Sequence, residues 1–149
     1  MLFNLRRLCF RTGSVLLACV VFPFIAQAEF LAVVVNHTNP VSSLRLIDLG
    51  SMYRGEDLHW AHGGRIKLVN RETSSPERKQ FYRTVLNAKP DQRFYVINTP
   101  IAVQSLIRRS DEAVLLFVTA IDGAIGYVRV SEVNDSVKVI LIIEAPSTP

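Results

Sequence analysis

The sequence predicts a single α/β domain with a mostly parallel central sheet flanked by helices. Short apolar segments rich in valine and isoleucine, which are typical of buried strands, alternate along the chain with segments of helical period. This alternation favours a layered α/β fold over an all-helical or all-strand fold. No internal repeat and no low-complexity tract interrupts the pattern. We expect the domain to cover residues 29–144, which is enough chain for one hydrophobic core.

The first half of the domain contains two strands and two helices. Residues 30–35 form a continuous apolar run that predicts a strand buried on both faces. Ser43 is placed to cap a helix whose apolar positions recur over residues 44–52. Residues 66–69 then predict the second strand. Residues 76–86 predict a helix that Ser75 caps and that opens on a proline, which suits a first helical position.

The second half begins with an ambiguous segment and ends in a helix and two strands. Residues 94–96 could pair as a strand, and Thr99-Pro100 could open a further helix. Ser110 is a good N-cap for the next helix, and Gly123 is placed to end it. The last two strands are expected at residues 124–130 and 137–143.

The first 28 residues have the pattern of a secretory signal peptide. Three arginines precede an apolar stretch over residues 15–25, and Ala26-Gln27-Ala28 supplies the small residues of a cleavage site. We therefore expect cleavage after Ala28 and a periplasmic protein that is not embedded in the membrane. The alternative is a lipoprotein signal that ends at Leu16-Leu17-Ala18-Cys19, although the apolar residues after it disfavour this interpretation.

The composition of the remaining chain indicates how the domain is stabilised and which class of partner is disfavoured. Both cysteines, Cys9 and Cys19, lie in the leader, so the mature domain must depend on core burial rather than on a disulfide. Three of the 17 basic residues also lie there, which leaves 14 basic residues against 13 acidic ones. This near balance, without a basic stripe carrying aromatic residues, argues against a nucleic-acid partner. A disordered tail is expected at residues 145–149.

A candidate anion site lies where the second strand runs into the second helix. The start of a helix presents unpaired backbone N–H groups and the positive end of the helix dipole, so an arginine beside it suits an oxyanion. The candidate ligands are Arg71 at the strand end and Ser75, Pro76, Glu77 and Arg78 at the helix start. The alternative for Arg71 is a surface ion pair with Glu72 or Glu77.

Several short motifs occur in an order and spacing that match a known family. They are Asn39-Pro40-Val41-Ser42-Ser43-Leu44, Met52-Tyr53-Arg54-Gly55, Trp60, Gly63-Gly64, Arg71, Ser75 and Arg78 ahead of Phe81-Tyr82, and Gly123-Ala124-Ile125-Gly126-Tyr127-Val128. This series resembles the periplasmic phosphate-binding proteins of ABC transporters, which have the type 2 periplasmic-binding fold. The resemblance extends from about Val33 to Val130.

The resemblance implies proteins with two α/β lobes that close on one phosphate, and it implies that this chain is a short form with a single three-layer lobe. Arg71 matches the family's arginine, and Ser75 matches the serine of its Ser-Gly-Thr cradle. Pro76 stands at the glycine position and removes a backbone donor. Glu77 stands at the threonine position and replaces a hydroxyl donor with a negative charge. We therefore expect weak phosphate binding at most.

Two functions are compatible with these features. The first is solute binding in connection with phosphate uptake, with phosphate or another small oxyanion as ligand and an ABC permease, a sensor or a second copy of the chain as partner. The second is a partner-binding or sensor-associated lobe whose ligand site has eroded. No cofactor is expected.

Enzymatic and metal-binding alternatives have little support in the sequence. No Gly-x-Ser-x-Gly motif is present, and the glycines at 123–128 lack the lysine of a phosphate-binding loop. His59 and His62 lie near Glu56 and Asp57, but a zinc site needs three or four ligands that converge. We expect a protein that is not an enzyme and holds no metal.

Overall fold

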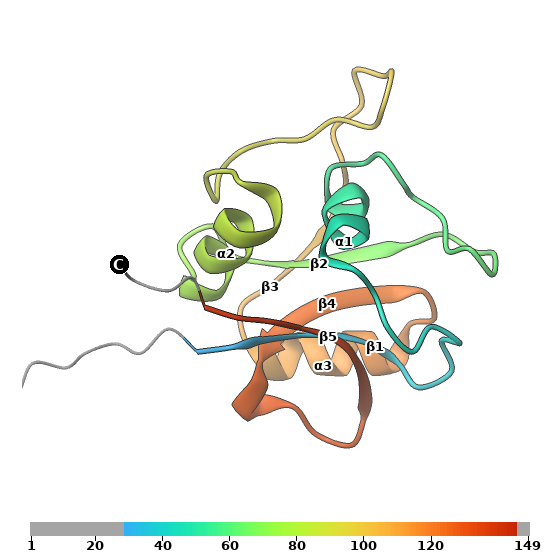
Figure 1. Cartoon of the computed structure of the whole chain (residues 1–149), viewed down its shortest axis with the longest axis vertical. Coiled ribbons are helices and arrows are strands. Elements are labelled where there is room, and N and C mark those ends of the chain that lie inside the picture. Colours follow the sequence, from blue (N-terminus) through green and yellow to red (C-terminus); the bar gives the residue numbers. More distant parts are fainter. Residues whose placement is uncertain (1–28, 146–149) are drawn as a thin grey trace, which may run out of the picture.

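A five-stranded sheet lies at the centre of the structure, a computed structural model that describes residues 29–145 (Figure 1). The strands are β1 (Leu31–Asn36), β2 (Lys67–Arg71), β3 (Leu106–Arg108), β4 (Ala124–Arg129) and β5 (Val137–Ile143), in the spatial order β3-β2-β4-β1-β5. The helices are α1 (Leu46–Tyr53), α2 (Pro76–Phe81), which continues into a π-helical turn (Tyr82–Leu86), and α3 (Asp111–Ala120). A short 3₁₀ turn covers Val130–Glu132. The predicted signal peptide and residues 146–149 of the predicted tail lie outside the described residues.

Four of the five strands run in the same direction. β2 pairs in parallel with both β3 and β4, whereas β1 is antiparallel to both of its neighbours, β4 and β5. The expectation of a mostly parallel sheet is confirmed, and β1 is the exception. Because β1 lies between β4 and β5 and packs against both layers, its residues Leu31–Val35 are all buried.

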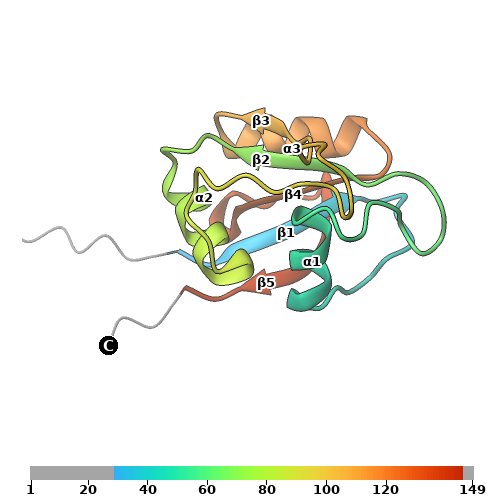
Figure 2. The ribbon, with the colours of Figure 1, turned by 90° about the horizontal axis from the view of Figure 1, so that it is seen from above.

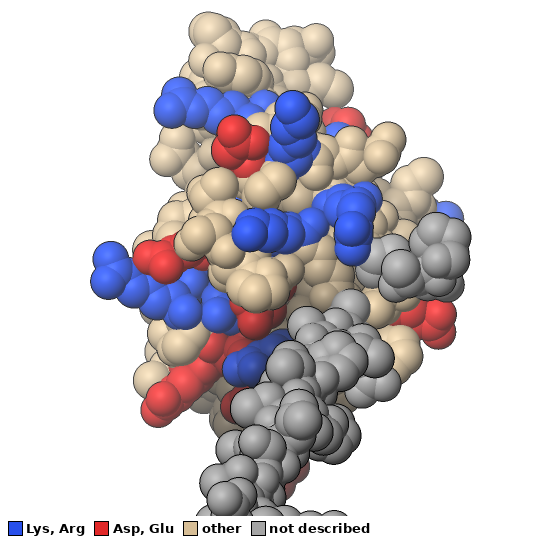
Figure 3. Space-filling model, turned by 90° about the vertical axis from the view of Figure 1, so that its left-hand side faces the viewer, with Lys and Arg blue, Asp and Glu red and all other residues tan. Residues whose placement is uncertain are grey.

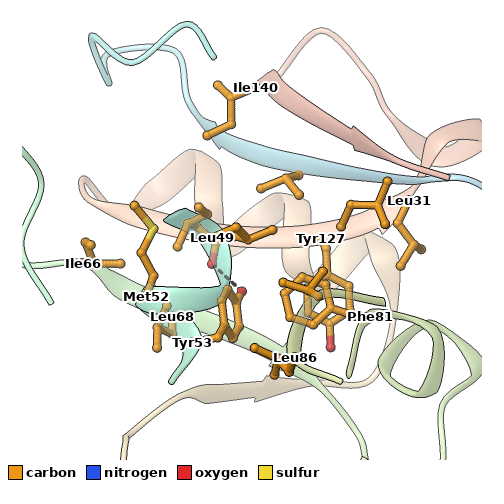
Figure 4. Close-up of a cluster of buried hydrophobic side chains, with 14 of the residues drawn as sticks. Leu31, Leu49, Met52, Tyr53, Ile66, Leu68, Phe81, Leu86, Tyr127 and Ile140 are labelled. Atoms are coloured by element: carbon orange, nitrogen blue, oxygen red, sulfur yellow. Dashed lines mark hydrogen bonds between the residues drawn. The ribbon is translucent and has the colours of Figure 1, made fainter. Parts of the chain in front are cut away.

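The alternation of side chains along β1 divides the core into two apolar layers. Leu31, Val33 and Val35 point toward α1 and α2, where they join a cluster containing the rings of Tyr53, Phe81 and Tyr127 (Figure 4). Ala32 and Val34 point toward α3 and pack with Val114 and Val118. The molecule thus has the predicted three layers, with helices on both faces of the sheet (Figures 1 and 2).

Gly126 allows α3 to pack close to β4. A Cβ atom at this position would lie 2.8 Å from Cγ1 of Val114 and 3.3 Å from Cβ of Val69. A larger residue would therefore push the helix that carries Asp111 away from the sheet.

The predicted helix caps are confirmed at two of three places. Ser75 accepts a hydrogen bond from the backbone N–H of Arg78 (3.1 Å), and Ser110 accepts one from Ala113 (3.1 Å). The prediction for Ser43 is wrong, because α1 begins only at Leu46. The backbone N–H of Leu44 instead donates to the carbonyl oxygen of Ile140 (3.0 Å), which ties this segment to β5.

Residues 94–103, called the arm below, form an irregular hairpin rather than a regular strand or a helix. Val96 N–H donates to Ile101 O (2.8 Å), and Val103 N–H donates to Phe94 O (2.9 Å). The suggestion that Thr99-Pro100 opens a helix is therefore wrong. Figure 1 shows the arm projecting beyond α1 and α2 before the chain returns to β3.

Candidate functional site

Arg71 is the last residue of β2, at the edge of the sheet where parallel strands end. The chain after β2 turns into α2, and the chain after the neighbouring strand β3 turns into α3. Two helix starts consequently lie beside Arg71, which is a common arrangement for ligand sites in α/β folds. Arg71 is only 5% exposed, so its charge needs a partner inside the protein or a ligand.

Two carboxylates of the protein provide that partner. Nη1 of Arg71 forms an ion pair with Asp111 Oδ1, and Nη2 lies 3.6 Å from Glu77 Oε2. Nη2 also donates to the carbonyl oxygen of Arg109 at 3.2 Å, while Nε is buried without a hydrogen-bond partner. Of the two ion pairs considered for Arg71, the one with Glu77 forms, and Glu72 pairs with Arg109 instead (2.9 Å).

Arg129, at the end of β4, completes a cluster of four charges. Its Nε lies 2.7 Å from Asp111 Oδ2 and 3.5 Å from Glu77 Oε1. The hydrogen bond to Asp111 is the main reason that the pKa of the Arg129 guanidinium is raised. Together these residues form what we call the charge cluster: Arg71, Glu77, Asp111 and Arg129.

Both carboxylates of the charge cluster lie in the first turn of a helix, Glu77 in α2 and Asp111 in α3. A negative charge is favoured there, and each side chain also meets the buried guanidinium of Arg71. The protein therefore supplies its own oxyanions to the buried guanidinium of Arg71.

Sequence reasoning missed the role of Asp111 and the involvement of Arg129. Asp111 had only the local signal of an acidic residue after a helix cap, and it lies 40 positions from Arg71. Arg129 had no local signal at all, because its position beside α2 and α3 depends on how β4 pairs with β1 and β2.

The remaining predicted site residues, Ser75, Pro76 and Arg78, do not join the charge cluster. Ser75 uses its hydroxyl group to cap α2, and Pro76 is exposed. Arg78 points away from the charge cluster: its Nη1 donates to Arg71 O (2.9 Å), its Nε donates to Pro90 O (2.7 Å), and its guanidinium lies 4.6 Å from the centre of the Tyr82 ring. The five predicted residues are thus close in space, but the two arginine side chains have different contacts. Arg71 contacts carboxylates, whereas Arg78 contacts backbone carbonyl groups and the ring of Tyr82.

A buried polar network fixes the end of β2 between these two arginines. Asn70 donates to the Tyr82 hydroxyl (2.9 Å) and accepts hydrogen bonds from the Tyr127 hydroxyl and from Arg71 N–H (3.0 Å). Because Asn70 and Arg71 are successive strand residues, their side chains point to opposite faces. Asn70 faces the layer of α1 and α2, and Arg71 faces α3.

The histidine loop and the glycine motif have structural roles in the described residues. Trp60 donates its indole N–H to Gly123 O (3.1 Å), and the ring of His62 stacks on Trp60 with centroids 5.8 Å apart. Gly123 has φ of +78°, and a Cβ there would lie 2.7 Å from the carbonyl oxygen of Arg65. Within residues 29–145, no group of three or more His, Cys, Asp and Glu side chains is placed to hold a metal ion. No helix in this range is long and apolar enough to cross a membrane.

The sequence matches no family model, and no curated protein matches it significantly. Solved structures do match. An ABC-type phosphate transport receptor from Vibrio cholerae is 28% identical with a TM-score of 0.61, over 75% of this chain and 47% of that one. A structure from Clostridium perfringens, described as a phosphate ABC transporter substrate-binding protein with bound phosphate, is 26% identical with a TM-score of 0.61, over 75% of this chain and 45% of that one.

PstS from Borrelia burgdorferi shares only 15% identity, but its TM-score of 0.62 over 75% of this chain supports the same fold. This chain covers 47% of PstS, so it spans about half the length of the solved structures that it matches. Three quarters of this chain therefore has the fold of about half of each of these substrate-binding proteins of phosphate ABC transporters, at low sequence identity.

Proposed function

We propose that this protein is a non-enzymatic, periplasmic, single-lobe solute-binding-like protein that binds phosphate or a related oxyanion weakly, in connection with ABC-type phosphate uptake. The observation that carries the proposal is the buried guanidinium of Arg71 between two helix starts. The similarity of the chain to about half of two solved phosphate-binding proteins supports the same assignment. An ABC permease or a sensor would be the partner that recognises the lobe once the oxyanion is bound to it.

Weak binding follows from competition within the protein. A phosphate that approaches Arg71 must displace the carboxylate of Glu77 and must tolerate the negative charge of Asp111. Hydrogen bonds to charged groups contribute about 1.5–3 kcal/mol each. A site that keeps half of the roughly −8 kcal/mol of a micromolar complex binds in the millimolar range.

Calorimetric titration of residues 29–149 with inorganic phosphate tests this proposal. The variant Glu77→Gln removes the competing charge, and we expect it to bind phosphate about tenfold more tightly than the unchanged protein, a difference of ~1.4 kcal/mol. Glu72→Gln is the matched control, because it removes the same charge from a side chain that pairs with the exposed Arg109. Sulfate and acetate titrations show whether the site prefers phosphate. Absence of binding by both the unchanged protein and Glu77→Gln at millimolar phosphate would reject the proposal.

The second candidate function is a partner-binding or sensor-associated lobe without a ligand. The specific observation in its favour is that Arg71 already has two carboxylate partners, so its charge needs no external anion. This candidate predicts that Glu77→Gln does not create phosphate binding, and the same titration therefore separates the two functions.

A further inference from the structure

A cavity of about 540 Å³ lies on the opposite face of the sheet from the charge cluster. Tyr53, Asn70 and Tyr82 line one side of the cavity. Residues 91–94 and 102–105, at the two ends of the arm and next to them, line the other side. Figure 2 shows this stretch of chain running alongside β2, from α2 toward α1. The volume falls within the ~300–1,000 Å³ range of small-molecule sites. None of the four charge-cluster residues lines the cavity.

Arg78 enters this cavity as a positioned cation without an acidic partner. Two of its nitrogens are held by the carbonyl oxygens of Arg71 and Pro90, and the ring of Tyr82 lies against its guanidinium. Among residues 29–145, no carboxylate lies within ion-pair distance of Arg78, and its Nη2 has no hydrogen-bond partner. The three contacts restrict the side chain before any ligand arrives, which lowers the entropy cost of binding.

The surroundings of Arg78 favour an anion with a polar body. Arg93 adds a second positive charge to the lining and Asp91 adds one carboxylate; both side chains are exposed, which leaves Arg78 as the cation held in place. The face around α2 also carries exposed basic side chains, among them Lys79 and Arg83, and Figure 3 shows Lys and Arg gathered over this part of the surface. The neutral polar lining consists of hydroxyl and amide groups, namely Thr73, Gln92, Gln104 and Ser105.

We infer that this cavity is a second anion site, separate from Arg71, for a small organic oxyanion that carries hydroxyl groups. The anionic head of the ligand, a phosphomonoester or a carboxylate, pairs with Nη2 of Arg78. The hydroxyl groups of its body bind the amides and hydroxyls on the wall that contains Gln104 and Ser105. Inorganic phosphate would contact Arg78 but has no body to reach the opposite wall, so water would fill the rest of the cavity.

Titration of ¹⁵N-labelled residues 29–149, followed by NMR, tests the inference. The probes are glycerol 3-phosphate, glycerate, inorganic phosphate and glycerol. We expect glycerol 3-phosphate or glycerate to shift the amide signals of Arg78, Gln104 and Ser105 at millimolar concentration, at least fivefold more tightly than inorganic phosphate, while glycerol has no effect. The stronger of the two organic anions identifies the head group.

Three variants test the location of the site, and none of them removes the positive charge of residue 78. Gln104→Glu places a negative charge on the wall opposite the anion, and we expect it to weaken binding by about tenfold. Lys67→Gln makes the same change in net charge on an exposed residue at the other end of β2 from Arg71, outside the cavity lining, and it should leave the affinity unchanged. Arg78→Lys keeps the charge but not the planar fork, so it should weaken binding partially.

Three results would overturn the inference. They are the absence of shifts with both organic anions, equal affinity for inorganic phosphate, and equal binding by the protein with and without Gln104→Glu. Shifts confined to Asp111 and Arg129 would instead locate the anion at Arg71. The inference and the function proposed for Arg71 can therefore fail independently.

Discussion

The Glu77 carboxylate lies 3.6 Å from the Arg71 guanidinium, and both side chains are almost fully buried. Glu77 is thereby placed between Arg71 and Arg129, at the start of α2. A helix start beside a buried arginine attracts anions of any origin, and here the sequence itself supplies one. Replacement of Glu77 would therefore remove one of the two carboxylates that contact the Arg71 guanidinium.

Removal of Arg71 should destabilise the fold strongly. Arg71→Met leaves the buried carboxylate of Asp111 with Arg129 as its remaining ion-pair partner, and loss of one member of a buried ion pair costs about 3–5 kcal/mol. Urea denaturation of residues 29–149 measures the change. Arg109→Ala, whose side chain is 89% exposed, should change the free energy of unfolding by less than about 1 kcal/mol. Equal effects of the two variants would show that the charge cluster does not stabilise the fold.

The hydroxyl group of Ser75 should matter for the stability of α2. Ser75→Ala removes the cap on Arg78 N–H, and we expect a loss of about 1 kcal/mol in the free energy of unfolding. Ser74→Ala is the control, because Ser74 is an exposed neighbour outside the cap. If Ser75→Ala lowered phosphate affinity while leaving stability unchanged, the hydroxyl would be a ligand rather than a helix cap.

Gly126 should be required for the distance between α3 and β4. Gly126→Ala places a methyl group 2.8 Å from Cγ1 of Val114, and overpacking of this kind costs about 1–3 kcal/mol. Val114→Ala opens the same space, so the double variant should lose less stability than the sum of the two single variants. Strict additivity of the three measured free energies would argue against this contact.

Stability should fall at alkaline pH because of two buried phenols. Burial raises the pKa of Tyr53 and of Tyr127 above the ordinary value, so both remain protonated in the fold. In the unfolded chain they ionise near pH ~10, and above this pH the unfolded state is increasingly favoured. The stabilisation is therefore complete below about pH 10 and is lost as the pH rises beyond it. Urea denaturation between pH 8 and 11 measures the slope, which Tyr127→Phe should reduce and the exposed Tyr95→Phe should not.

The sequence was informative wherever the signal is local. The caps at Ser75 and Ser110 involve residues only three positions apart, and short-range geometry is enough to predict them. The prediction failed at Ser43 and in the arm, where contacts with distant residues decide the conformation. The N–H of Leu44 bonds to Ile140, and the N–H of Ile97 bonds to Gly55 (3.1 Å).

The amino-acid sequence alone determined the class of fold, the order of its elements apart from β3, and the position of Arg71 at the end of a strand that leads into a helix. Only the tertiary structure decided what Arg71 meets. Strand pairing carries Asp111 and Arg129 from distant positions to the end of β2, and the packing of α2 turns the Arg78 side chain away from them, toward Tyr82. Local propensity contains no information about such pairings, because they are set by which strands share hydrogen bonds and which apolar faces are buried together.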